Sequence, residues 1–153
     1  MMDTKFMKMA ITQAKLGAKK YDEVPIGAVI VKDGKVIARA HNLKEKKNCA
    51  NHHAEMVAIE KACKVIGDWR LIGCDLYVTL EPCPMCVGAI INARLDNVYF
   101  GAYDEKAGAL CSKCQLMEMK FNHYAAYQGG IMEKECAALL SDYFKAKRGK
   151  AWL

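Results

Sequence analysis

Two short motifs, far apart in the sequence, constrain the fold of this chain more than any other feature. The first is His53-Ala54-Glu55, which precedes an apolar-periodic run, and the second is the segment PCPMC that carries Cys83 and Cys86. Proline is favoured at the first position of a helix, because its missing N–H would have no partner there. Both motifs predict helix N-termini. If the imidazole and the two thiols hold one metal ion, these N-termini must lie side by side.

The donor set of His53, Cys83 and Cys86 indicates a catalytic zinc site with one ion per subunit. Zinc prefers imidazole nitrogen and thiolate sulfur, and three protein ligands leave its fourth position for water. Cys83 and Cys86 are one helical turn apart and face the same way, and a helix N-terminus favours thiolates. We expect Glu55 to take a proton from the activated water and hand it on.

Each motif also has an ordinary structural interpretation. An isolated His-x-Glu triplet is more often a plain helix start, and a lone Cys-x-x-Cys is redox-active, metal-binding or simply buried. It is the combination of the two that favours a catalytic zinc ion. His52 lacks the spacing to Glu55, so we expect it to flank the site or lie on the loop surface.

The composition is that of an ordinary globular protein. The 153 residues are 53% hydrophobic and 26% charged, which suits one domain with a substantial core. No apolar run approaches the roughly 18 residues of a membrane span. The N-terminal segment is interrupted by lysines and lacks the apolar centre of a signal peptide. We therefore expect one domain over residues 1–153, no membrane association and a cytoplasmic location.

Cysteine and charge leave two questions open. The chain has eight cysteines, which stay reduced in the cytoplasm. Cys111 and Cys114 could form a second metal site with ligands such as Cys49, His52 or His123, but we favour partly buried thiols. The net charge of +6 and the basic segment 145–150 suit an anionic partner such as RNA. They suit a solvated lysine-rich surface equally well.

The hydrophobic pattern predicts alternating helices and strands. An apolar strand, an Asp-Gly turn and a second strand form a β-hairpin. The order of the elements predicts a three-layer α/β/α domain, with a mixed five-stranded sheet and helices on both faces. The expected elements are a helix within 1–21, strands at 26–31 and 36–40, a helix at 53–65, a strand at 74–80, a helix after Cys83, a strand at 96–102, a short helix within 103–121, a strand or irregular segment within 122–131, and a helix at 132–148.

The pattern H-x-E…P-C-x-x-C is the signature of zinc nucleobase deaminases. From about residue 6 to residue 148 the sequence resembles the bacterial tRNA-specific adenosine deaminases of the cytidine deaminase superfamily. The zinc residues indicate only the superfamily, whereas "WRL", "LYVTLEPC", "FGAYDEKAGA" and "LLSDYFKAKR" indicate the tRNA branch. The resemblance implies a cytidine deaminase-like fold and a homodimer that converts adenosine to inosine at the wobble position of a tRNA anticodon loop.

The resemblance also implies residue roles. Water activated by zinc attacks C6 of the adenine, while Glu55 protonates N1 and carries the proton to the leaving ammonia. Asn42 touches the flipped nucleotide, and Asp104 lies near the RNA backbone. The pocket walls include Val24 and the backbone around Ala54 and Pro82. Asparagine is also common in turns, so Asn42 could simply end the hairpin, and Asp104 could cap a following helix.

Two further functions stay open. The chain could deaminate a free nucleobase or nucleoside such as guanine or cytosine, because "PCPMC" and "VGAI" also suit guanine deaminases. It could also be a non-catalytic zinc module that binds RNA or a protein, although zinc retention does not need Glu55. Cys111 and Cys114 stand where the family commonly has a glycine-serine turn. That departure bears on the substrate more than on the chemistry.

Overall fold

A computed structural model describes residues 1–151 of the chain, and the side chains of residues 1–148. The last two residues of the predicted domain, and the side chains at the end of the basic segment 145–150, lie outside this description. The five-stranded sheet has the order β2-β1-β3-β4-β5. β1 pairs antiparallel with β2 and β3, whereas β3, β4 and β5 are parallel, so the sheet is mixed as predicted. The strands are β1 (Gly27–Lys32), β2 (Lys35–His41), β3 (Cys74–Leu80), β4 (Asn97–Ala102) and β5 (Ala126–Gln128).

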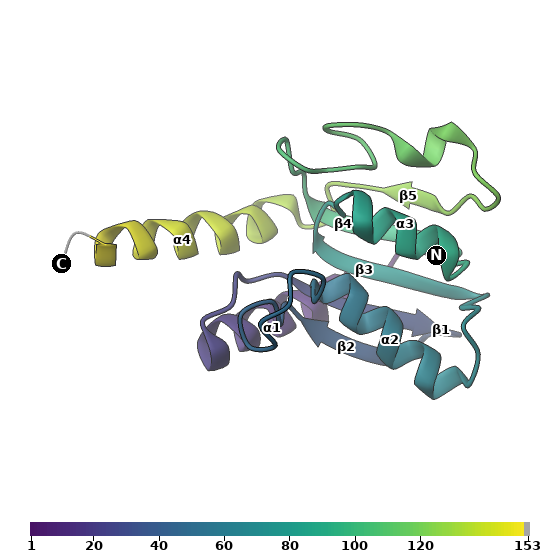
Figure 1. Cartoon of the computed structure of the whole chain (residues 1–153), viewed down its shortest axis with the longest axis horizontal. Helices are drawn as coiled ribbons and strands as arrows, with labels where there is room; N and C mark the ends of the chain where they lie inside the picture. Colours follow the sequence, from purple (N-terminus) through teal and green to yellow (C-terminus); the bar gives the residue numbers. More distant parts are fainter. Residues whose placement is uncertain (152–153) are drawn as a thin grey trace.

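Helices cover both faces of the sheet, which confirms the three-layer prediction (Figure 1). One face is covered by α2 (Ala54–Ile66) and α3 (Pro84–Asn92), and the other by α1 (Thr4–Tyr21) and α4 (Glu133–Ala151). Because strand side chains alternate between faces, neighbouring residues of β1 enter different cores. Ile30 packs in the core under α2 and α3, and Val29 packs in the core under α1.

The β1–β2 hairpin follows from its sequence almost residue by residue. Asp33 and Gly34 have φ angles of 50° and 74°, which a tight two-residue turn requires and which this residue pair adopts readily. A register shift between Ile30 and Val31 marks a bulge in the hairpin. The observed strands differ from the predicted ones by one residue at each end, and α2 likewise begins and ends one residue later than predicted.

The region between β4 and α4 is mostly turns. It contains a short 3₁₀ helix, η1 (Leu116–Met119), and the three-residue strand β5, which pairs with β4. The sequence predicted a short helix and a strand or irregular segment here, so both expectations are confirmed in type. α4 packs on β4 through its first turns and then extends away from the sheet (Figure 1). Among the described residues, no helix is long and apolar enough to cross a membrane.

Candidate active site

The two helices on one face of the sheet begin beside each other. His53 is the N-cap of α2 and Cys83 is the N-cap of α3, with Pro84 as the first helical residue. The Sγ atoms of Cys83 and Cys86 each lie 3.6 Å from Nδ1 of His53. The ligand atoms of these three residues all lie within 4.8 Å of one another, so they could hold one metal ion. Nitrogen and sulfur donors in this number suit zinc with a fourth position left for water.

The electrostatics of the three donors already favour a thiolate. The pKa of Cys83 is lowered to about 4, first by a hydrogen bond with the Cys86 thiol and then by one with His53, against the effect of burial. The same hydrogen bond, together with burial, raises the pKa of Cys86. The hydrogen bond to Cys83 raises the pKa of His53. A metal cation would displace the protons that these three groups share, because metal binding requires deprotonated thiols and neutral imidazole.

Glu55 lies in the first turn of α2 and is only 4% exposed. Burial raises its pKa to about 7, although a hydrogen bond to its own backbone N–H and one with the Cys86 thiol oppose the shift. The Glu55 carboxyl is therefore adjacent to the three-donor cluster. A buried carboxyl with a pKa near neutrality can both hold and release a proton at the pH of a cell.

Asn42 follows directly after β2 and is 5% exposed. Its backbone N–H donates to the carbonyl of Ile26 at 3.1 Å. Its Oδ1 atom is buried and has no hydrogen-bond partner among the described residues. An asparagine that only ended the hairpin would use this atom in the turn, since buried polar atoms are normally paired. The free acceptor instead suits a ligand group.

The remaining predicted pocket residues fall into two places. Ala54 and Pro82 are buried directly beside the donors His53 and Cys83 in the sequence. Val24 and Asp104 line a cleft of ≈480 Å³. None of the three donors lines this cleft, but Leu80, which lies three residues before Cys83 in the sequence, does. The cleft is also lined by Ile26, Tyr103, Glu105, Lys106, Leu140 and Phe144.

Asp104 caps a turn and not a helix. Its Oδ1 atom accepts the backbone N–H groups of Lys106 and Ala107 at 3.1 and 3.2 Å. Turns follow it, and the next helix is η1. Cys111 and Cys114 are half-buried and pack against the core. Within the described residues, the group of His53, Cys83 and Cys86 is the one metal-ligand cluster, so a second site at these two thiols is not formed.

Sequence reasoning assigned no role to Glu81, which is 2% exposed at the end of β3. Burial alone would raise the pKa of this carboxyl, but hydrogen bonds from Ser112 and from nearby backbone N–H groups lower it below its ordinary value. A glutamate that closes an apolar strand, immediately before Pro82 and Cys83, was the available signal. Its donors are the backbone N–H groups of Asp104, Leu110, Cys111 and Ser112 and the hydroxyl of Ser112.

Comparison with known proteins agrees with this geometry. The family model of MafB19-like deaminases matches residues 1–148. The tRNA-specific adenosine deaminase of Bacillus subtilis (strain 168) is 50% identical over 149 residues, which is 97% of this chain and 92% of that protein. A solved structure from studies of A-to-I editing by tRNA:A34 deaminases at the wobble position of transfer RNA is 44% identical. It has a TM-score of 0.85, with 90% of this chain and 100% of that chain covered.

A guanine deaminase structure from Bacillus subtilis is also similar, with 47% identity and a TM-score of 0.65. The match covers 67% of this chain and 66% of that chain, so it is less extensive than the match to the tRNA:A34 deaminase. The expectation of a cytidine deaminase-like α/β fold is thereby confirmed. The chain belongs to the MafB19-like deaminase family and, within it, to the group of the tRNA-specific adenosine deaminases.

Proposed function

We propose that this chain hydrolyses adenosine to inosine at the wobble position of a tRNA anticodon loop, using one zinc ion per subunit. The observation that carries the proposal is the convergence of three zinc-type donors beside the buried Glu55. The extensive similarity to tRNA-specific adenosine deaminases supplies the substrate class. The overall reaction consumes adenosine and water and gives inosine and ammonia.

His53, Cys83 and Cys86 are the residues that would hold the zinc ion. When bound, zinc supplies a water molecule that is acidic enough to act as a nucleophile near neutral pH. Glu55 would take up one proton of that water and pass it to N1 of the adenine, and would then take up the second proton of the same water and deliver it to the departing ammonia. Its burial would keep bulk water from competing for that proton, and its hydrogen bond with Cys86 supports a role beside the donor cluster.

The surroundings of the donor cluster suit an unpaired nucleotide. The unpartnered Oδ1 atom of Asn42 can accept a hydrogen bond from the flipped nucleotide. Extruding a base from an anticodon loop costs less than extruding it from a duplex. The charge of Lys44, in the loop between Asn42 and His53, acts on His53, so that loop borders the site. The exposed lysines of this loop can bind backbone phosphates. They are Lys44, Lys46 and Lys47.

The decisive test is inosine formation by zinc-loaded protein, with an anticodon stem-loop that carries a wobble adenosine. A matched stem-loop with guanosine at that position is the control for site specificity. We expect inosine at the wobble position and one equivalent of ammonia. A wobble adenosine that stays unchanged after prolonged incubation with zinc-loaded protein would contradict the proposed substrate.

A second candidate function is deamination of a free nucleobase or nucleoside such as guanine or cytosine. The 47% identity to a guanine deaminase structure favours it, although the match covers two thirds of the chain. Guanine, cytosine, cytidine and adenosine are therefore run in parallel with ammonia release as the readout. Release of ammonia from a free base, with the RNA unchanged, would leave the proposed role of Glu55 in place. It would mean that the substrate is the free base and not the tRNA.

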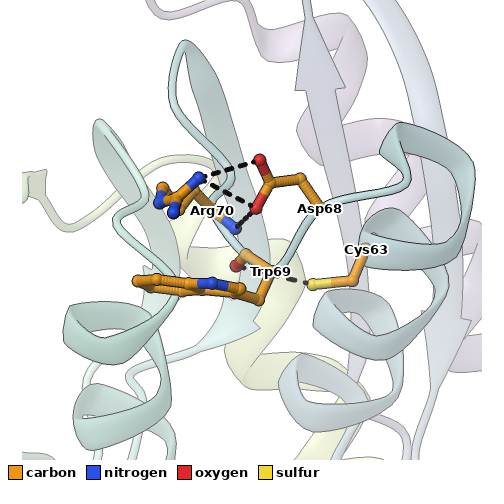
Figure 2. A network of polar contacts seen from close by, with 4 residues as sticks. All are labelled: Cys63, Asp68, Trp69 and Arg70. Carbon is orange, nitrogen blue, oxygen red and sulfur yellow. Dashed lines mark hydrogen bonds and ion pairs between the residues drawn. The ribbon is translucent and has the colours of Figure 1, made fainter.

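We further propose that the chain acts as one domain over residues 1–153 and assembles as a homodimer, as the family resemblance implies. At the ends of α2 and α3 opposite the donor cluster, an apolar groove of ≈290 Å³ includes Ile59, Cys63 and Trp69. Figure 2 shows the Trp69 indole extending from the end of α2 towards α3. The indole is 53% exposed, and the Arg70 guanidinium lies 4.7 Å from its centroid.

A tRNA substrate would place the reaction in the cytoplasm.

Sedimentation measurements test this assembly. We expect a dimer for the unaltered protein and a monomer for Trp69→Glu, because a charge in the groove opposes apolar contact. Phe121→Glu is the matched control, since Phe121 is equally exposed at 53% but does not line the groove. A monomeric unaltered protein would contradict the proposed dimer.

A further inference from the structure

Glu81 is a buried carboxylate that the proposed chemistry does not use, and it fastens a loop segment at both ends. Its Oε1 atom accepts the backbone N–H of Asp104 at 3.1 Å. Its Oε2 atom accepts three consecutive backbone N–H groups, of which that of Cys111 is nearest at 2.8 Å. The residues from 104 to 112, here called the 104–112 segment, form turns without regular secondary structure. One side chain thus replaces the backbone pairing that a strand or helix would provide.

The 104–112 segment fits the carboxylate so closely that Gly108 has no room for a side chain. A Cβ atom at Gly108 would lie 2.3 Å from Cδ of Glu81, and 2.4 and 2.5 Å from its two oxygens. The next residue, Ala109, donates its backbone N–H to the carbonyl of Pro82 at 2.8 Å. The segment is therefore bonded to the two residues that immediately precede the proposed ligand Cys83.

The segment also forms one wall of the cleft that Leu80, at the end of β3, lines as well. Asp104 and Lys106, at the start of the segment, line this cleft of ≈480 Å³. Val24 and Phe144 line it from elsewhere in the chain. The far end of the segment is anchored in the core, where Ala109 is fully buried. Any shift of the segment would therefore move the cleft wall relative to the donor cluster.

We infer that Glu81 is a positioning residue, which fixes the 104–112 wall so that the nucleotides beside the reacting adenosine are held in register with the donor cluster. This inference rests on the proposed function and assigns the cleft to the neighbouring nucleotides. Among the described residues, the side-chain hydrogen bonds of Glu81 go to the 104–112 segment and none goes to the three donors. It acts through the hydrogen bonds to the 104–112 segment.

Glu81→Gln is the first test, because glutamine has the same shape but turns one accepting oxygen into a donating amide. That amide would face backbone N–H groups. We expect KM for the anticodon stem-loop to rise about 10-fold or more, the scale on which residues supporting an active site act. Zinc content should stay at one ion per subunit and kcat per zinc should change little. Glu133→Gln is the control, since Glu133 is an exposed glutamate on α4, and its KM should equal that of the unaltered protein.

Gly108→Ala gives an independent test that leaves Glu81 unchanged. The added methyl group would push against the carboxylate, and we expect a similar rise in KM. In a Glu81→Ala background the same methyl group fits into the vacated space, so Gly108→Ala should add little there. Equal effects of Gly108→Ala in both backgrounds would contradict the inference, because the two residues would then act separately.

A purely structural role gives a different result. The melting temperature would fall under either role, but a purely structural role would leave KM of the folded, zinc-loaded molecules unchanged. The rate of hydrogen exchange at the backbone amide of Cys111 tests directly whether Glu81 holds the segment. Glu81→Gln should raise that rate. If the unaltered protein is active on the stem-loop and Glu81→Gln has the same KM, the inference fails alone. If the unaltered protein forms no inosine, the proposed function and this inference both fail.

Discussion

Glu55 and Glu81 are each two residues from a donor of the cluster, on opposite sides in the sequence. Glu55 lies two residues after His53, and Glu81 lies two residues before Cys83. Both are nearly inaccessible to solvent, at 4% and 2% exposure. Burial raises the pKa of Glu55 to about 7, whereas hydrogen bonds lower the pKa of Glu81 despite its burial.

The two carboxyls differ in the hydrogen-bond donors that surround them. Glu55 has its own backbone N–H and the Cys86 thiol, and Glu81 has Ser112 and several backbone N–H groups of one loop. A buried carboxyl with few donors gains from holding a proton, and one with many donors stays an anion. Burial by itself therefore does not decide the direction in which the pKa of a carboxyl shifts. The number of hydrogen-bond donors around the carboxyl decides it as well.

The largest effect is expected from removing one of the proposed metal ligands. Cys86→Ala removes a donor from the cluster, and we expect loss of zinc, loss of activity and a marked fall in stability, because metal binding is coupled to folding. Cys136→Ala is the control, since Cys136 is an equally buried cysteine outside the cluster. Elemental analysis and thermal unfolding measure both variants. An unchanged zinc content in Cys86→Ala would show that the cluster is not the metal site.

Glu55→Gln is expected to have the next largest effect. Loss of a general acid–base group typically lowers the rate by about 10²–10⁴-fold. Zinc should remain, and the melting temperature should not fall, because a neutral amide relieves the burial of the carboxyl. Glu81→Gln should instead lower the melting temperature, so the two variants differ in sign. A Glu55→Gln protein that keeps its zinc and its full activity would show that Glu55 is not the acid–base group.

A third carboxylate extends the comparison to another loop. Glu23 is fully buried, and its two oxygens accept the backbone N–H groups of Glu45 and Lys46 at 3.1 and 2.7 Å. We expect Glu23→Gln to lower the free energy of unfolding by about 1–3 kcal/mol, the cost of a mismatched buried hydrogen bond. Denaturant titration measures this change. A neutral result would break the rule that donors from a loop mark a structural carboxylate.

The smallest expected effect sets the baseline. Lys64 and Glu60 form an exposed ion pair at 3.7 Å on α2, with side chains 78% and 63% exposed. Exposed pairs of this spacing contribute about 0.3–0.5 kcal/mol. Lys64→Ala should therefore change the free energy of unfolding by no more than about 0.5 kcal/mol. A change in the free energy of unfolding as large as that of Glu23→Gln would mean that burial does not explain the difference between the exposed Glu60 and the buried Glu23.

Local sequence predicted the elements that depend on local physics. The hairpin follows from apolar strands around Asp33-Gly34, and α3 begins where Pro84 favours a helix start. β5 has only three residues, which carry no measurable alternation, so the sequence alone does not distinguish a strand from an irregular segment there. The pairing of β5 with β4 sets its structure. The donors His53, Cys83 and Cys86 were predicted from type and spacing, and the structure places their ligand atoms together.

Glu81 could not be assigned from its neighbours in the sequence. Its donors lie in the 104–112 segment, so its surroundings exist only in the folded chain. The same holds for Glu23, whose donors lie in the loop after Asn42. Asp104 was expected to cap a helix or approach RNA, and a local turn accounts for its side-chain hydrogen bonds. The role of a residue whose hydrogen-bond partners are distant in the sequence can be assigned only once the fold is known.

The sheet order also has a consequence for the time course of folding. The β1–β2 hairpin joins neighbours in the sequence, but the donors come together only after β3 has paired with β1, for example Val78 with Ala28. Pairing of distant segments is slow compared with hairpin closure. We therefore expect the donor cluster to assemble late in refolding. Zinc would then act mainly on the unfolding rate, and would govern how long a molecule stays folded more than how quickly it folds.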